Sequence, residues 1–332
     1  MDTTDVQALP RELIVKKIRQ WGDITTDAIL DKSCLVFTMP GLSGFIGYRC
    51  ESGCAVVMGS PICDITEQEN LVLAFHEFCK KNSLKVVHAL ITREFCEWLM
   101  QKQLAQISIE FGEKIIMDPH APPMEHTGPK ASLVRRKVKH ALNEGTVIQE
   151  HQRNDPKIEA LMEEAGRKWL KSRKGPQVHI SNVQLFTDRF GKRWFYAVKG
   201  GILTGLLQLN KLEKNEGWLL NHLMITPEAS NGTPELLVVA TLEQLAKENC
   251  SYVTTGIIPL TKLGKIEGMS SFGVWATRLL YQLAKRVFHL DGHRKFWEKF
   301  HPKTDPCFLA FSEKNMNPRM LIGLMKALNV TV

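Results

Sequence analysis

The sequence predicts a mixed α/β (α+β) chain of two tandem domains, each built on a mixed sheet flanked by helices. Two observations predict this fold. A strand-loop-helix-strand pattern occurs once in each half of the chain, and a proline-rich segment lies between the two copies. With 332 residues, of which 44% are hydrophobic, the chain can bury the cores of two domains.

The first copy of the pattern lies in residues 54–91. The β-branched run CAVVMG at 54–59 predicts a strand, and LKVVHALI at 84–91 predicts the next one. Between them, LVLAFHEFCKKN at 71–82 has apolar residues at helical spacing. These three segments predict a strand-helix-strand unit.

The second copy begins with GWLLNHLMI at 217–225, which predicts a strand. Thr233 is expected to cap the following helix and Pro234 to occupy its first position, where a helix tolerates proline. The helix is ELLVVATLEQLAKEN at 235–249, and SYVTTGII at 251–258 is the closing strand. The same order of elements in both halves indicates an internal duplication.

The segment DPHAPPMEHTGPK at 118–130 is the predicted linker, because proline and glycine interrupt regular structure. We therefore expect one domain over residues 1–125 and a second over residues 126–332. The second domain opens with two helices rich in basic residues, at 131–145 and 156–175. Antiparallel strands and turns follow and lead into the second copy of the pattern.

Charge and hydropathy restrict the class of protein. The net charge of +8 favours acidic partners such as nucleic acid, anionic lipid headgroups or phosphorylated metabolites. No run approaches the roughly 18 apolar residues of a membrane span, and the polar start MDTTDVQALP does not resemble a secretory signal. We expect a cytoplasmic protein that is at most peripheral at the inner membrane face, with its eight cysteines reduced.

The order of strands and helices in the second half matches that of the Gcn5-related N-acetyltransferase fold. Five segments, in order, are similar to those of one particular family: GFIGYR (44–49), VVMGSPICD (56–64), VRRKVKHALNEG (134–145), WLKSRKG (169–175) and DGHRKFWEKFHPKTDPCFLAF (291–311). They resemble the soluble catalytic domain of phosphatidylglycerol lysyltransferases, which esterify a membrane lipid with an amino acid taken from aminoacyl-tRNA.

This resemblance implies two tandem acetyltransferase-like domains and an aminoacyltransferase activity. The donor substrate would be aminoacyl-tRNA, with no other cofactor and no metal. The acceptor would be a phosphatidylglycerol-like lipid, or another hydroxyl or amine. The implied partners are therefore tRNA and an anionic lipid headgroup or membrane surface.

Three positions depart from the family pattern. Where the family carries an aspartate and, three residues on, an arginine, this chain has His222 and Ile225. Where the family offers a glutamate before its terminal motif, this chain has Lys285. The family's membrane-embedded N-terminal portion has no counterpart in the sequence, so we expect a soluble stand-alone form.

The predicted catalytic residues are His222, Glu298 and Lys299. His222 lies on the central strand where this fold opens a cleft, and an imidazole there could take the proton of an acceptor hydroxyl; the alternative is a structural histidine. The predicted substrate-binding residues form a basic rim for phosphate groups: Arg135, Arg136, Lys137, Arg173, Lys174, Arg294 and Lys295. The alternative for these cations is a solvated helix surface.

The terminal stretch 294–311 places cations among aromatic residues. We expect Phe296 and Phe300 to pack inward, one helical turn apart, while the cations, Lys299 among them, face the mouth of the cleft. Pro302 should end this helix, and CFLAF at 307–311 should form a final strand.

Two other functions remain open from the sequence. Acetyl-CoA enzymes of this fold hold pyrophosphate on a glycine-rich loop at a helix N-terminus, whereas TPEASNGTPE at 226–235 has a single glycine. This composition disfavours a CoA-dependent N-acyltransferase. The third possibility is a non-catalytic protein that binds tRNA or an anionic membrane.

Overall fold

The computed structural model describes residues 9–152, 154–172, 185–288 and 291–328. The elements of the first half are α1 (Arg11–Trp21), η2 (Thr26–Leu30), β1 (Leu35–Phe37), β2 (Ile46–Glu51), β3 (Cys54–Met58), α2 (Gln68–Lys81), β4 (Lys85–Thr92), α3 (Arg93–Gln101) and β5 (Ile107–Met117).

The second half begins with α4 (Pro129–Asn143), β6 (Val147–Glu150), α5 (Pro156–Ser172), β7 (Lys192–Lys199), β8 (Ile202–Leu212), η3 (Glu213–Asn215), β9 (Gly217–Ile225), α6 (Thr233–Lys247) and β10 (Val253–Pro259). It ends with β11 (Ile266–Glu267), α7 (Ser271–Phe288), α8 (Asp291–Trp297), η4 (Glu298–Phe300), β12 (Lys303–Phe311) and α9 (Pro318–Ala327).

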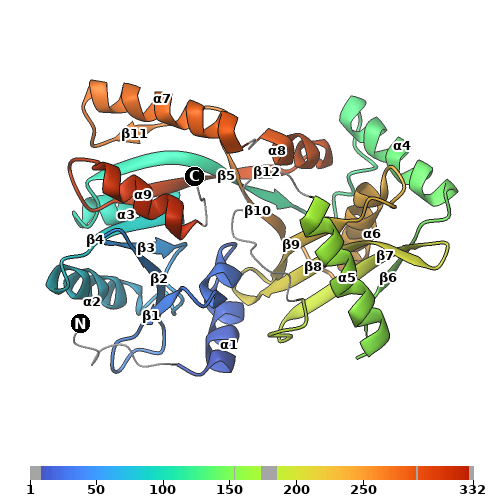
Figure 1. Cartoon of the computed structure of the whole chain (residues 1–332), viewed down its shortest axis with the longest axis horizontal. Helices are drawn as coiled ribbons and strands as arrows, with labels where there is room; N and C mark the ends of the chain where they lie inside the picture. The colour runs from blue at the N-terminus through green and yellow to red at the C-terminus, as the bar shows by residue number, and fades with distance from the viewer. Residues whose placement is uncertain (1–8, 153, 173–184, 289–290, 329–332) are drawn as a thin grey trace.

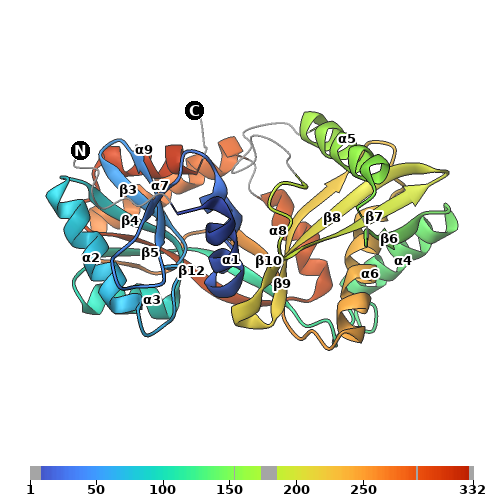
Figure 2. The same cartoon turned by 90° about the horizontal axis from the view of Figure 1, so that it is seen from below.

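The described residues form one mixed sheet with helices on both of its faces (Figures 1 and 2). Along the sheet the strands lie in the order β1-β2-β3-β4-β12-β5-β10-β9-β8-β7-β6, and β11 pairs with β5 beside this path. One core cluster lies where α2 and α3 cover the first half, and another where α4 and α6 cover the second. The predicted mixed α/β class is confirmed.

Both strand-helix-strand units form as predicted, with parallel strands. In the first, β3 and β4 pair along all of Cys54–Met58, with α2 as the connection. In the second, β9 and β10 are joined by α6, but they pair only at Trp218 with Val253 and at Leu219 with Thr254. Beyond these two pairs the strands separate, so the second unit is open where the first is closed.

The sheet runs continuously through the predicted domain boundary. Strand β12, from the end of the chain, lies between β4 and β5 of the first half, and α9 packs against β2 and β3. Strand β5 in turn pairs with β10 of the second half. The division at residues 125 and 126 stays a prediction, because β12 belongs by sequence to the second half and by pairing to the first.

The start of α6 differs from expectation. The capping residue is Gly232, which has φ +105°, and Thr233 is already the first helical residue. Pro234 is therefore the second helical residue. The Thr233 side chain is fully buried and its hydroxyl has no hydrogen-bond partner, so it does not cap the helix.

None of the helices that the structure describes has the length and apolarity needed to cross a bilayer. All eight cysteines are free thiols, and those other than Cys34 and Cys50 are buried.

Two histidines form a buried pair between α2 and β4. Their Nε2 atoms lie 3.0 Å apart, and the rings of His76 and His88 stack with centroids 5.3 Å apart. Burial lowers the pKa of His76 to about 4, and it lowers the pKa of His88 well below the ordinary histidine value. Both rings are therefore neutral in the folded protein at neutral pH, and one Nε2 donates to the other.

The fold should consequently lose stability in mild acid. In the unfolded chain these histidines bind protons below about pH 6.5, whereas the folded state cannot until near pH 4. Their contribution is complete above pH 6.5 and is lost as the pH falls toward 4. The free energy of unfolding, measured with urea, should fall more between pH 7.5 and pH 5.0 for the wild type than for the double variant His76→Gln/His88→Gln. Equal losses would contradict this assignment.

Candidate active site at the divergence of β9 and β10

The sheet is irregular at the place where β9 and β10 separate. In the β8–β9 ladder, Gln208 pairs with His222 and Leu209 pairs with Leu220, so Asn221 is the extra residue of a β-bulge. A bulge changes the face toward which the following side chains point. Nothing in the residue pattern indicates this bulge, which lies beside the predicted catalytic histidine.

The bulge places His222 on the opposite face of β9 from α6. Leu220 before the bulge and Leu223 after it both pack against the core cluster under α6, while Met224 joins the cluster under α5. By alternation, His222 shares the face of Met224. Its side chain is partly exposed, and its strand neighbour Gln208 lies on the same face because the two residues are directly paired.

Where the strands separate, β10 has open space beside a glycine, and both β8 and β10 carry a buried polar atom without a partner. Gly256 has φ +91°, and a Cβ added there would meet no atom within 4 Å. The hydroxyl of the neighbouring Thr255 and the Oε1 atom of Gln208 are buried without a hydrogen-bond partner. The imidazole of His222 is thus paired across the ladder with Gln208, whose Oε1 atom is available to accept a hydrogen bond.

The N-terminus of α6 is covered by other parts of the protein. A Cβ on Gly232 would lie 2.1 Å from the carbonyl oxygen of Lys137, so the loop before α6 packs directly on α4. The ammonium of Lys137 donates to Asn231 in the same loop. In the first turn of α6, Glu235 supplies the negative charge that a helix N-terminus favours.

Lys299 lies at this covered helix start and not at the surface, which corrects the expectation of a solvated cation. Its ammonium is 2.5 Å from a carboxylate oxygen of Glu235, and both residues are buried. It also lies 3.9 Å from the ring centroid of Phe296. Because η4 turns more tightly than an α-helix, residue 299 rotates inward toward α6.

The same tight turn changes which rings are buried. Phe300 packs inward as predicted, with 2% of its surface exposed, but Phe296 is only partly buried. Trp297 takes the second core position, since residues three apart align in a 3₁₀ turn. The predicted final strand is confirmed as part of β12, which begins directly after Pro302.

The other predicted residues of the terminal stretch divide into paired and free side chains. The guanidinium of Arg294 is 2.7 Å from Glu113 and also donates to the carbonyl of Pro259, so it is held in place and is not a solvated cation. Glu298 lies 3.3 Å from Lys130 of α4. Lys295 is exposed and, among the described residues, has no ion-pair or hydrogen-bond partner.

The basic residues of α4 divide in the same way. Arg135 donates to the carbonyl oxygens of Met124 and His126 and so fixes the linker to the helix. Arg136 is exposed and forms no hydrogen bond or ion pair within the described part of the chain. Arg173 and Lys174 lie outside the described residues.

The structure therefore brings two of the predicted regions together. Helix α4 packs against both α6 and η4, so the basic helix and the terminal stretch share one side of the second half (Figure 1). His222 is on the other face of β9. Lys285, which stands where the family has a glutamate, donates to the carbonyl of Thr261 just beyond β10.

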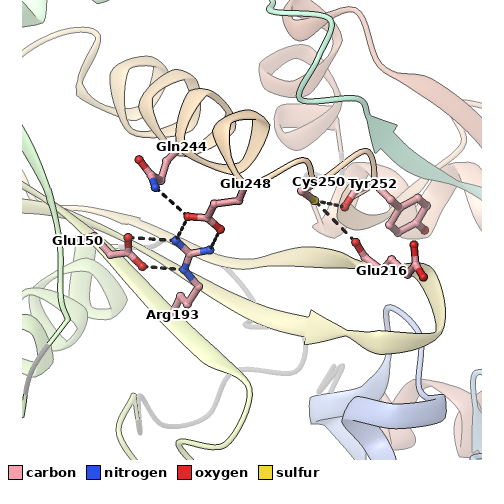
Figure 3. Close-up of polar contacts among 7 residues, drawn as sticks. All are labelled: Glu150, Arg193, Glu216, Gln244, Glu248, Cys250 and Tyr252. Carbon is pink, nitrogen blue, oxygen red and sulfur yellow. Dashed lines mark hydrogen bonds and ion pairs between the residues drawn. The ribbon is translucent and has the colours of Figure 1, made fainter.

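A charged cluster that the sequence did not indicate lies at the C-terminal end of α6. The guanidinium of Arg193 is held between the carboxylates of Glu150 and Glu248, with contacts of 2.6–3.0 Å, and Gln244 donates to Glu248 (Figure 3). Burial alone would lower the pKa of Arg193, but the two carboxylates raise it above its ordinary value. The cluster joins β6, β7 and α6 and is structural.

The duplicated unit, the mixed sheet and the separated central strands define a protein of the acetyltransferase-like (Gcn5-related N-acetyltransferase) class. Residues 21–311 match the sequence model of the family described as "Phosphatidylglycerol lysyltransferase, C-terminal", so the chain belongs to that family. Membership in this family supports the assignment of this protein as a transferase.

Solved structures show the same fold over nearly all of the chain. One is named as the C-terminal domain of a lysylphosphatidylglycerol synthetase from Agrobacterium fabrum; it has a TM-score of 0.76 at 17% identity and covers 96% of each chain. Another, named L-PGS from Bacillus licheniformis, has a TM-score of 0.77 at 15% identity and covers 98% of each chain. FemX has a TM-score of 0.52 at 9% identity, covering 97% of this chain and 99% of its own. No match was found among curated proteins.

Proposed function

We propose that the protein is an aminoacyl-tRNA-dependent aminoacyltransferase that moves an amino acid to a phosphatidylglycerol-like lipid, or to another hydroxyl or amine acceptor. The observation that carries the proposal is the family match, which spans both halves of the chain. The fold shared with the lysylphosphatidylglycerol synthetase domain supports it. The donor is aminoacyl-tRNA, with no other cofactor, and the protein acts in the cytoplasm or at the inner membrane face.

The proposed reaction is an exchange of one ester for another. The acceptor oxygen attacks the aminoacyl carbonyl carbon, the bond to the tRNA ribose oxygen breaks, and that oxygen takes up a proton. Since bond energies change little, positioning and charge stabilisation can supply most of the rate. His222 is the proposed base that takes the acceptor proton and returns it to the leaving oxygen.

The exposed cations are the proposed contacts to phosphate. Arg136 on α4 and Lys295 on α8 are both exposed, and α4 packs against η4, which directly follows α8. Arg135, Lys137, Arg294 and Lys299 act differently, because their polar groups already bind carbonyl, amide or carboxylate groups. In this proposal they hold the surface in shape while Arg136 and Lys295 meet the ligand.

Two alternatives make different use of the same fold. A CoA-dependent N-acyltransferase would place pyrophosphate at the N-terminus of α6, but Gly232 packs directly against α4 there. A non-catalytic binding protein would keep the exposed cations without using His222. The positions at which this chain departs from the family pattern favour the non-catalytic binding protein over the CoA-dependent enzyme.

A transfer assay separates these functions. The protein is incubated with total charged, radiolabelled aminoacyl-tRNA and a lipid extract, and the organic phase is counted. We expect label in the lipid, and we expect it to fall strongly for His222→Ala, because the acceptor would lose its base. Transfer from labelled acetyl-CoA alone, or tRNA binding without any transfer, would contradict the proposal.

Binding of tRNA should depend on the two free cations. Arg136→Glu with Lys295→Glu should weaken binding and reduce the slope of log K against log salt by about 0.7–0.9 for each lost phosphate contact. The control is Lys80→Glu with Lys81→Glu, which makes the same change of charge on α2, in the other half. A filter-binding titration in which both double variants behave alike would refute a specific site.

A further inference from the structure

Helix α7 presents large apolar side chains to solvent. Five are exposed by about half or more: Phe272 (75%), Trp275 (59%), Leu279 (47%), Leu280 (53%) and Leu283 (51%). The rings of Phe272 and Trp275 contact each other, with centroids 5.8 Å apart. An exposed apolar patch of this kind marks a surface that binds something.

The spacing of these residues gathers them on one side of the helix. Phe272, Trp275, Leu279 and Leu283 follow each other at intervals of three or four residues, so they form a stripe along one face. The opposite face binds the protein, where Tyr281 packs against Phe111. The stripe therefore points outward, along the edge of the molecule where Figure 1 shows α7.

The charges around this stripe are almost all positive. Residues 271–288 include no aspartate or glutamate, and the two cations Arg278 and Lys285 of α7 donate to backbone carbonyls in the loop before the helix. In the loop before the helix, Lys262 and Lys265 are exposed, and Glu267 pairs with Lys265. An outward stripe of Phe, Trp and Leu beside cations is the pattern of a helix that lies in the interface of an anionic membrane.

We propose that α7 is a membrane-docking helix, which inserts the side chains of this stripe into the surface of an anionic lipid bilayer. A second copy of the chain would bring the same cations face to face, so the charge favours lipid over self-association. This proposal rests on the proposed function in one respect, which is that the same bilayer would supply the lipid acceptor of the transfer reaction.

The contacts of α7 connect this docking surface to the candidate active site. The hydroxyl of Tyr281 donates to the carbonyl of Leu260, and the ammonium of Lys285 donates to that of Thr261. Both carbonyls come directly after β10, whose divergence from β9 forms the site. A docked α7 would thus hold the end of β10 near the lipid, so that an acceptor headgroup has a short path to the site.

Co-sedimentation with vesicles tests the docking helix without tRNA. The vesicles contain phosphatidylcholine and phosphatidylglycerol in equal parts, and the variant is Trp275→Ser with Leu279→Ser. We expect the partition coefficient to fall about tenfold or more, because binding scales with the apolar area inserted. The control, Ile65→Ser with Ile202→Ser, removes apolar residues exposed by 68% and 57% elsewhere and should bind like the wild type.

A second readout reports insertion directly. Brominated lipids in the same vesicles should quench part of the tryptophan fluorescence, and Trp275→Phe should remove that part while vesicle binding persists. Unchanged binding by the stripe variant, or unchanged quenching by Trp275→Phe, would overturn the proposal. So would a dimer, seen by sedimentation without lipid, that the stripe variant converts to monomer while vesicle binding is unchanged.

The docking proposal and the proposed function fail in distinguishable ways. The stripe variant should still transfer label to acceptor lipid dispersed in detergent, where docking is not needed. If the wild type transfers no label in any assay but its vesicle binding depends on the stripe, only the proposed function fails. If the wild type transfers label and the stripe variant binds vesicles normally, only the docking helix fails.

Discussion

Replacement of Lys299 by alanine is expected to lower the free energy of unfolding by about 3–5 kcal/mol. The variant leaves the carboxylate of Glu235 buried without its cation, 2.5 Å from where the ammonium lies in the wild type. An uncompensated buried charge is costly because the interior solvates it poorly. The aromatic contact with Phe296 is lost as well.

Two controls separate this effect from a general loss of charge. Lys295→Ala removes an exposed cation four residues earlier and should change the free energy of unfolding by no more than about 0.5 kcal/mol. Lys299→Met with Glu235→Leu removes both charges and should be much milder than Lys299→Ala alone. Urea unfolding at neutral pH measures all three. If Lys299→Ala were as stable as the wild type, the buried pair would not be a stabilising contact.

Replacement of Phe300 by alanine should have an effect of the same size, about 3–5 kcal/mol, for a different reason. Phe300 has 2% of its surface exposed and packs in the core cluster shared by α4, α6 and η4. Its ring lies 5.5 Å from that of Phe296 and 5.8 Å from that of Trp297. Truncation leaves a cavity where three elements meet, so the surroundings cannot easily close it.

The comparison with Phe296→Ala tests this burial. Phe296 is only partly buried, so its truncation removes less area from the core and should cost clearly less than that of Phe300. The quantity compared is the midpoint of urea unfolding at constant m-value. Equal losses for the two variants would mean that the tight turn of η4 does not place Phe300 alone in the core.

The sequence could not show which cations of the terminal stretch are paired and which are free, because this depends on the carboxylates that lie beside each of them in the folded protein. Arg294, Lys295 and Lys299 lie within six residues of one another and have the same charge, yet two are paired and one is free. Their closest partners are Glu113 and Glu235, which are far away in sequence, while Glu298, the i+4 neighbour of Arg294, lies 3.9 Å from it. Spacing along a helix shows neighbours on that helix, but not the residues that other elements bring to it.

The sequence by itself determined the local elements and the family. The strand at 217–225 and both strand-helix-strand units follow from hydrophobic periodicity, a property of neighbouring residues. The match over residues 21–311 rests on the same linear order of residues. Several boundaries shifted by a few residues, and at the start of α6 the reason is Gly232, whose positive φ made it the cap in place of Thr233.

Only the tertiary structure decided how these elements combine. The place of β12 between β4 and β5, the bulge beside His222 and the cluster around Arg193 each depend on hydrogen bonds or ion pairs between distant segments. The same is true of the exposed stripe on α7. Helical spacing shows that its apolar residues share a face, but not whether that face is covered. Burial is set by the rest of the chain, so the side chains left at the surface are known only from the folded protein.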